Sequence, residues 1–398
     1  TSGEIRNRLP GGDVGSWLII PPRSTPMPVS FNCAVFWLNL RRGLAPMTGA
    51  LLVLVALAVD RGASLPQAVS LGNEDAAALL RGLRRTDQWI ALGALLLPLS
   101  VLQTARHWSR LVHSERSWLL SGSISKASLC FSTWAGAWVS SLIWVLLAAG
   151  LCEWSAMGVG SGTGVGTRTD WLLHSSLDME SVQRVGTEGR LRWNSTVPAS
   201  SGDGLVRLSV RLYGLDNQAE SFEFSVLQAD GTTIDRTEVQ PALLSTLEVS
   251  VPAQGGEFVF ELRAKQARRA LRLHQAQLHH FVPGPRGMPT LLLALRLALI
   301  LAAAQALVLG LGAWFTAPTT VLYVAGGYGL LWLEADQMAG SWVQRWVPGF
   351  DLPEALQWIA EGRGPQAIAP SAALGTVGLV VLGLGLLHLG LGRLRGGR

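Results

Sequence analysis

The sequence predicts a polytopic α-helical membrane protein of about six transmembrane helices, with an inserted all-β domain of the sandwich or jelly-roll type. Hydrophobic residues make up 49% of the 398-residue chain and charged residues only 15%, against roughly 25% charged in an average soluble domain. The apolar residues gather into long runs, as expected of helices that cross a bilayer. One long internal stretch instead alternates apolar and polar residues, which is the period of half-buried strands.

Residues 1–43 are predicted to form a cytoplasmic segment that contains an interfacial helix. Phe31 to Leu40 is rich in aromatic and apolar residues but too short to span, which favours a helix along the membrane surface. The alternative is that this stretch extends the first span.

Residues 44–152 are predicted to hold three spans, at about residues 44–59, 89–103 and 127–152. Pro98 lies inside the second run, where proline removes a backbone hydrogen bond and can act as a hinge. Small residues of the third run, including Gly136 and Ser141, allow close approach of another helix. The loop at 106–126 is the most basic short loop, so the positive-inside rule places it in the cytoplasm.

Residues 153–286 are predicted to form the β domain. A Gly/Ser/Thr linker at 158–167 leads into short alternating runs such as Val206 to Leu212 and Phe222 to Val226. Six or seven such strands at this spacing are typical of a sandwich or jelly roll. The domain lies between the third and fourth spans and is therefore expected outside the cytoplasm.

Residues 287–398 are predicted to contain spans at about 289–315, 321–333 and 372–391, with an interfacial or re-entrant segment at 337–370. Arg296 and His388 lie near span ends, where their side chains can snorkel to the interface. The basic C-terminal tail and the even number of spans place both termini in the cytoplasm.

Signatures of catalysis and of cofactor or metal binding are missing from the sequence. It contains neither a P-loop nor an HExxH motif, and the three cysteines show no metal spacing. His274, His279 and His280 are interpreted as surface histidines at a strand end rather than as metal ligands. We therefore expect no catalytic residue, no cofactor and no metal. The net charge of +5 is attributed to membrane anchoring rather than to binding of nucleic acid.

The informative segment is the basic loop after the second span. Trp108, Leu111 and Val112 can form one apolar stripe of a short amphipathic helix. Residues of this loop resemble the coupling segment of a known family: His113-Ser114-Glu115-Arg116, Trp118-Leu119-Leu120, Ser121 to Ser125 and Lys126. The family is that of the permease subunits of type 2 ATP-binding-cassette exporters, in particular the gliding-motility-like branch. An ordinary surface helix between two spans is the simpler interpretation.

The resemblance covers the membrane part of the chain and implies a transport subunit in a bacterial inner membrane, with no ATPase activity of its own. It implies two copies of a cytoplasmic ATP-binding subunit and a second permease as partners, and a lipid-linked, polysaccharide or other envelope substrate. The residues expected to couple the chain to the ATPase are Trp108, Arg110, His113, Glu115, Arg116 and Lys126. The β domain could receive cargo or bind an envelope protein.

Two other functions remain open from the sequence. The chain could be a membrane-anchored scaffold or sensor whose external β domain binds a ligand or a protein. It could also be a membrane-embedded hydrolase or transferase, which the missing acid, base and metal groups disfavour.

Overall fold

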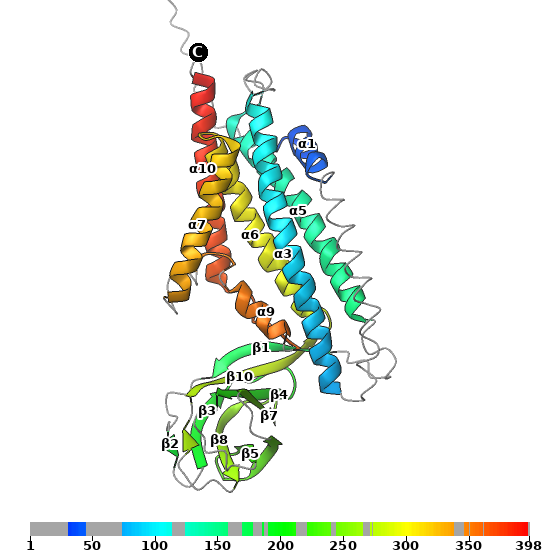
Figure 1. Cartoon of the computed structure of the whole chain (residues 1–398), viewed down its shortest axis with the longest axis vertical. Helices are drawn as coiled ribbons and strands as arrows, with labels where there is room; N and C mark the ends of the chain where they lie inside the picture. Colours follow the sequence, from blue (N-terminus) through cyan, green and yellow to red (C-terminus); the bar gives the residue numbers. More distant parts are fainter. Residues whose placement is uncertain are drawn as a thin grey trace, which may run out of the picture.

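The computed structural model describes residues 31–44, 74–113, 124–157, 169–177, 185–186, 190–211, 221–239, 244–265, 271–272, 274–337, 346–349, 351–360 and 362–396. It contains a bundle of long helices with a β domain at one end of the bundle (Figure 1). The short helix α1 (Cys33–Leu44) and the C-terminal end of the chain lie at the opposite end.

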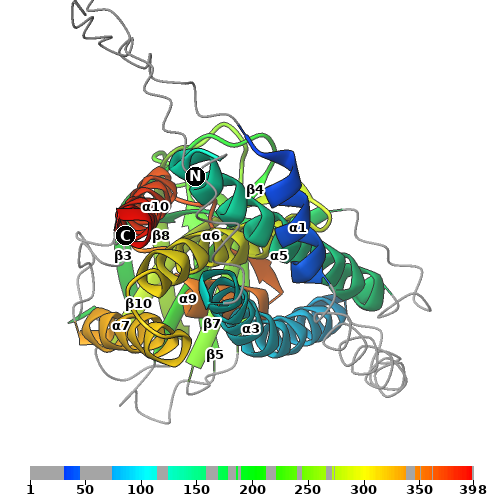
Figure 2. The same ribbon diagram turned by 90° about the horizontal axis from the view of Figure 1, so that it is seen from above.

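Four helices of the described residues are long and apolar enough to cross a membrane. They are α3 (Glu74–His113), α5 (Lys126–Met157), α6 (Met288–Gly312) and α10 (Pro370–Gly396). α6 lies at the centre of the bundle (Figure 2), and 72% of its most apolar stretch is buried, against 22% for α10. The bundle therefore packs around α6, and α10 leaves most of its surface outside.

The expected number of six spans is wrong for this structure, which supports about four. The second, third, fourth and sixth predicted spans correspond to α3, α5, α6 and α10. The fifth, residues 321–333, forms part of α7 (Ala317–Gln337), which is not among the candidate spans. Its apolar run is bounded by Thr319-Thr320 and Glu334, so it is short for a crossing. The first predicted span, 44–59, lies outside the described residues.

The β domain consists of two packed sheets, as the alternation predicts. One sheet has the strand order β11-β1-β10-β4-β7, the other the order β3-β8-β5-β6, and β2 pairs with β9 separately. The strands are β1 (Thr169–Leu177), β2 (Val185–Gly186), β3 (Arg190–Val197), β4 (Gly204–Arg211), β5 (Ser221–Leu227), β6 (Thr233–Val239), β7 (Leu244–Val251), β8 (Gly256–Lys265), β9 (Leu271–Arg272), β10 (His274–Pro285) and β11 (Arg363–Gly364).

The core of the β domain comes from the apolar positions of these alternating strands. Val206, Val210 and Phe224 are fully buried between the sheets. Trp193, Phe224 and Phe260 form a cluster of three rings, with centroids 6.1, 6.2 and 6.0 Å apart. Because the buried residues alternate with polar ones along each strand, the sequence places one face of each sheet inward.

The segment predicted as interfacial or re-entrant, 337–370, contains the short helix α9 (Leu352–Ala360). α9 lies between the bundle and the β domain (Figure 1). Its Ala355 and Ile359 pack in the bundle, and Trp358 packs on Phe281 of β10. β11 then joins the edge of the sheet beside β1. The segment therefore bridges the two parts of the molecule, while its position relative to a membrane stays a prediction.

Candidate functional site

Of the predicted coupling residues, Trp108, Arg110 and Lys126 lie at the end of the bundle opposite the β domain. Residues 106–113 are the last turns of α3 rather than a separate helix, and Lys126 is the first residue of α5. Arg110 is exposed. Glu115 and Arg116 lie outside the described residues, as does the side chain of His113. The coupling role of these residues stays a prediction.

Trp108 is not displayed to solvent. It is 1% exposed and packs with Leu111, Leu129 and Leu387 inside the bundle. The apolar stripe expected from the sequence exists, but it faces the other helices. A partner protein at this end would therefore meet the charged side of α3, and Trp108 would connect that end to the interior of the bundle.

Basic side chains gather at the same end. Arg41 and Arg42 end α1, Arg106 and Arg110 end α3, and Arg393 lies in the last turns of α10; all five are exposed. The halves of α3 and α5 nearer the β domain carry both signs of charge, Arg84 and Arg85 as well as Asp87 and Glu153. The five exposed arginines at the opposite end are therefore the feature that distinguishes the two ends.

A polar pocket lies inside the bundle, between α1, α3, α5 and α6. It is lined by Asn39, Arg42, Ser100, Gln103, Thr104, His107, Thr133, Ser140, Ser141 and Gln305, together with Gly43, Ala137 and Leu309. The centre of a water molecule can move within about 20 Å³ of it, enough for one water-sized group. We call it the inner pocket.

The inner pocket is held by hydrogen bonds between helices. Gln305 Nε2 of α6 donates to Ser141 Oγ of α5 at 2.7 Å, and Gln103 Nε2 of α3 donates to the backbone oxygen of Arg42 at 2.7 Å. At the rim, Arg42 Nη1 lies 3.4 Å from His107 Nδ1. Polar groups at membrane depth are costly and are functional candidates by default.

Gly136 explains how α1 reaches the pocket. A Cβ atom at this position would lie 2.6 Å from the Phe36 backbone oxygen and 2.7 Å from Asn39 Cβ. Only glycine lets α1 cross α5 so closely. This contact brings Asn39 of α1, 3% exposed, to the wall of the inner pocket and confirms the close packing expected for the third run.

Between the inner pocket and the β domain lies a large apolar cluster, at whose side Arg296 of α6 is buried and paired with Asp351. Leu96 of α3, Val145 of α5 and Leu297 of α6 belong to one buried cluster that also includes Trp89, Trp144, Ala148, Leu293, Leu301 and, from α9, Ala355 and Ile359. In α3, α5 and α6 these residues lie nearer the β domain than the pocket residues do. The inner pocket is therefore separated from the β-domain end by an apolar block.

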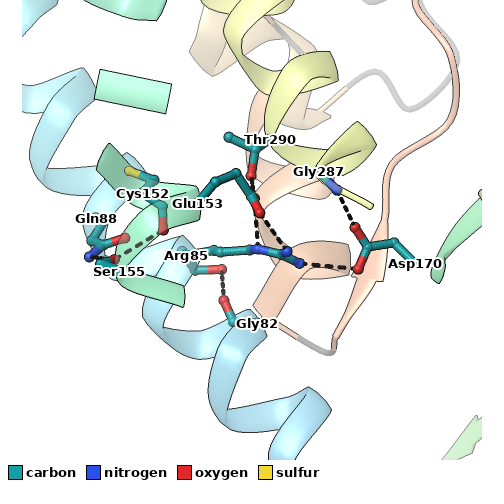
Figure 3. A network of polar contacts seen from close by, with 10 residues as sticks. Gly82, Arg85, Gln88, Cys152, Glu153, Ser155, Asp170, Gly287 and Thr290 are labelled. Atoms are coloured by element: carbon teal, nitrogen blue, oxygen red, sulfur yellow. Dashed lines mark hydrogen bonds and ion pairs between the residues drawn. The ribbon is translucent and has the colours of Figure 1, made fainter. Parts of the chain in front are cut away.

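The β domain is joined to the helices by a second polar group, which we call the junction network: Arg85, Glu153, Asp170, Gly287 and Thr290 (Figure 3). Arg85 of α3 contacts both oxygens of Glu153 in α5 at 3.0 Å and lies 3.5 Å from Asp170 of β1. Thr290 of α6 donates to Glu153, and the Gly287 N–H donates to Asp170 at 2.8 Å. Arg85 therefore joins α3 to α5 and β1 directly, and α6 is joined through the two carboxylates.

A third polar cluster joins the sheet to the segment that follows α9. Arg207 Nε of β4 donates to Glu248 of β7 at 2.9 Å, and Arg363 of β11 donates to the same oxygen. Burial alone would raise the pKa of Glu248, but Arg363 and Arg207 hold that pKa below its usual value. Glu248 therefore stays ionised at neutral pH and ties β11 to the sheet.

The histidines of β10 differ from the expectation of surface residues. His279 is 5% and His280 1% exposed. Burial lowers the pKa of each to about 4, aided by the charge of Arg207 for His279 and by His174 for His280. The residues that the structure describes contain no group of three or more side chains placed to hold a metal. Both histidines are therefore neutral parts of the fold at pH 7.

Sequence reasoning missed the partners of the polar residues in the spans. Arg296 does not snorkel: it is 5% exposed, and its Nε donates to Asp351 at 2.7 Å. Gln305 of the same helix is paired as well, because its Nε2 donates to Ser141 Oγ. Pro98 lies within α3 as expected, with its ring exposed, and its hinge role stays a prediction. The available signal was that an intramembrane polar residue needs a partner.

No family model matches the chain, and no curated protein matches it. The features of the molecule that bear on its function are therefore the inner pocket, the basic end and the two contacts with the β domain. Among the described residues, none of the exposed large apolar side chains belongs to the β domain.

Proposed function

We propose that the chain is the membrane-spanning subunit of an ATP-binding-cassette exporter that moves an envelope component, with ATP hydrolysis in a partner chain. The observation that carries this proposal is the inner pocket: polar side chains from four helices meet inside a bundle of candidate membrane spans. The apolar block on its β-domain side suits a transporter that is closed on that side. A bundle that served only as an anchor would need neither feature.

The distribution of charge supports an orientation with the basic end in the cytoplasm of a bacterium. Exposed arginines at the ends of α1, α3 and α10 lie on one side, and the positive-inside rule puts such residues in the cytoplasm. In this orientation the β domain is extracytoplasmic. The coupling segment 106–126 then faces the compartment that contains ATP.

The shape of α3 suggests how a partner could act on the pocket. Arg110 and the pocket residue Gln103 belong to the same helix, about 10 Å apart along its axis at 1.5 Å per residue. A push on the basic end would therefore move Gln103, Thr104 and His107 without an intervening joint. Pro98, on the far side of these residues, is where α3 could bend.

Co-purification in mild detergent from the native membrane tests this function. We expect two nucleotide-binding subunits and two permeases in a stable complex with ATPase activity, and loss of the nucleotide-binding subunits in Glu115→Arg. The matched control is Glu354→Arg, the same change at an exposed position of α9, which should keep them. Absence of an ATP-binding subunit from the wild-type complex would contradict the proposal.

The second candidate is a membrane-anchored sensor, which one observation favours. The junction network and the Glu248 cluster connect the β domain to α3, α5, α6 and the segment before α10. A ligand or envelope protein bound to the β domain could therefore shift the helices. This function needs no ATPase, so the same co-purification distinguishes it.

A further inference from the structure

We infer that the inner pocket binds the hydroxyl group of an uncharged substrate, such as a glycerol or sugar moiety, rather than a cation or a phosphate. The inference deepens the proposed function and rests on it, because this ligand would be the transported substrate. It follows from which polar atoms of the pocket are already used and which are left.

Two carboxamides of the pocket have oxygens that accept no hydrogen bond from the described residues. Asn39 Nδ2 donates to the Val35 backbone oxygen at 2.7 Å, which fixes the orientation of the amide because a carbonyl can only accept. Its Oδ1 is left buried and unpaired. Gln305 Nε2 donates to Ser141 Oγ, and its Oε1 is likewise buried and unpaired. Gln305 is 1% exposed, so water at the surface does not satisfy it.

Most of the hydroxyl groups that line the pocket already donate a hydrogen bond within the protein. Ser140 donates to the Ala137 backbone oxygen, and Thr104 to that of Ser100, both at 2.7 Å. Their remaining lone pairs are acceptors. Thr133 Oγ1, on a side chain 1% exposed, is unpaired. The two unpaired carboxamide oxygens can only accept, so they call for a donor, while the unpaired Thr133 hydroxyl can donate or accept. A group that both donates and accepts therefore complements these three atoms.

Charge decides which donor fits. The described residues that line the pocket include no carboxylate, and Arg42 and His107 lie at its rim, so a buried ammonium group would find no counter-charge among them. A phosphate oxygen only accepts, and it would face the oxygens of Asn39 and Gln305. A neutral hydroxyl donates to these oxygens, and a single hydroxyl matches the room for one water-sized group.

The test measures binding of four amphiphiles with one dodecyl chain to the purified full chain in lipid nanodiscs. They carry a glycerol ether, the same ether with both hydroxyls methylated, an ammonium group, or a phosphate. We expect the glycerol ether to bind at least about tenfold more tightly than its methylated form, since one hydrogen bond is worth about 1.4 kcal/mol. The ammonium and the phosphate should bind no better than the methylated ether.

Two variants locate the effect. Thr133→Val removes an unpaired hydroxyl and should not destabilise the ligand-free protein. Gln305→Leu removes an acceptor. Each variant should reduce the preference for the glycerol ether over its methylated form to threefold or less. Gln88→Leu, the same change near the junction network, should leave the preference intact. Equal binding of the two ethers, tightest binding of the ammonium or the phosphate, or a preference unchanged in Thr133→Val would overturn the inference. The measurement needs no ATPase, so it can fail independently of the proposed function.

Discussion

Replacement of Arg85 by methionine tests whether the junction network holds the β domain on the bundle. The arginine side chain is 8% exposed and its partners Glu153 and Asp170 are 15% and 18% exposed. Removing one partner of a buried ion pair costs about 3–5 kcal/mol, because the other charge is left uncompensated. Water can reach the two carboxylates in part, so we expect the lower end, about 3 kcal/mol, in the free energy of unfolding.

The double variant Arg85→Met/Glu153→Met makes this prediction specific. It removes the charge of Glu153 that the single variant leaves buried without a partner arginine, while Asp170 keeps the hydrogen bond from the Gly287 N–H. Replacing both members of a buried pair by apolar residues is often neutral. The double variant should therefore regain at least half of the stability that the single variant loses.

Denaturant titration of the full chain in mild detergent measures both changes, and hydrogen exchange of β1 and the first turn of α6 shows whether the loss is local. Arg236→Met is the matched control, because Arg236 is 75% exposed and 3.8 Å from Glu223, and surface pairs contribute at most about 1 kcal/mol. A loss below about 1 kcal/mol in Arg85→Met, or a double variant no better than the single one, would refute the reasoning.

Three further predictions concern the β domain and α1. The pKa values of His279 and His280 are about 4, below the ordinary 6.5. As the pH falls, these histidines take up protons in the unfolded state first, so the free energy of unfolding should decrease between pH 6.5 and 4. Tm measured across this range should decrease less steeply in His279→Gln/His280→Gln than in the wild type. The pKa of Glu248 is also lowered. Ionised Glu248 therefore stabilises the folded protein above the ordinary pKa of a carboxyl group, and this contribution is lost as the pH falls through the pKa of Glu248 in the folded state. Glu248→Gln should lower Tm at pH 7 more than at pH 3. Gly136→Leu should separate α1 from α5 and destabilise by at least about 1–3 kcal/mol, whereas Gly150→Leu, with nothing within 4 Å of the added Cβ, should not; equal effects would contradict the close contact.

The β strands could be predicted from the sequence because alternation is local. Val206, Phe224 and Val249 are buried where the pattern places them. The long apolar helices could be predicted for the same reason. The number of spans could not be predicted. The apolar run at 321–333 is short and flanked by polar residues, and a count of apolar runs does not show whether such a run crosses the membrane.

The polar contacts of the site were hidden because they join distant parts of the chain. Gln305 and Ser141 are 164 residues apart, Arg85 and Glu153 are 68 apart, and Arg296 and Asp351 are 55 apart. A single polar residue in a span indicates that a partner exists, but the sequence does not show where in the chain that partner lies. The burial of Trp108 was hidden in the same way, because an amphipathic stripe does not say whether it faces lipid, solvent or another helix.

Site-specific cross-linking in the native membrane most directly tests whether the basic end contacts an ATPase. A photoreactive amino acid placed at Arg110 should capture one ATP-binding protein, and the yield should change when ATP hydrolysis is blocked with vanadate. The same residue at Glu354, at the other end of the bundle, should not capture it. Cross-links from position 110 to lipid alone would contradict the account.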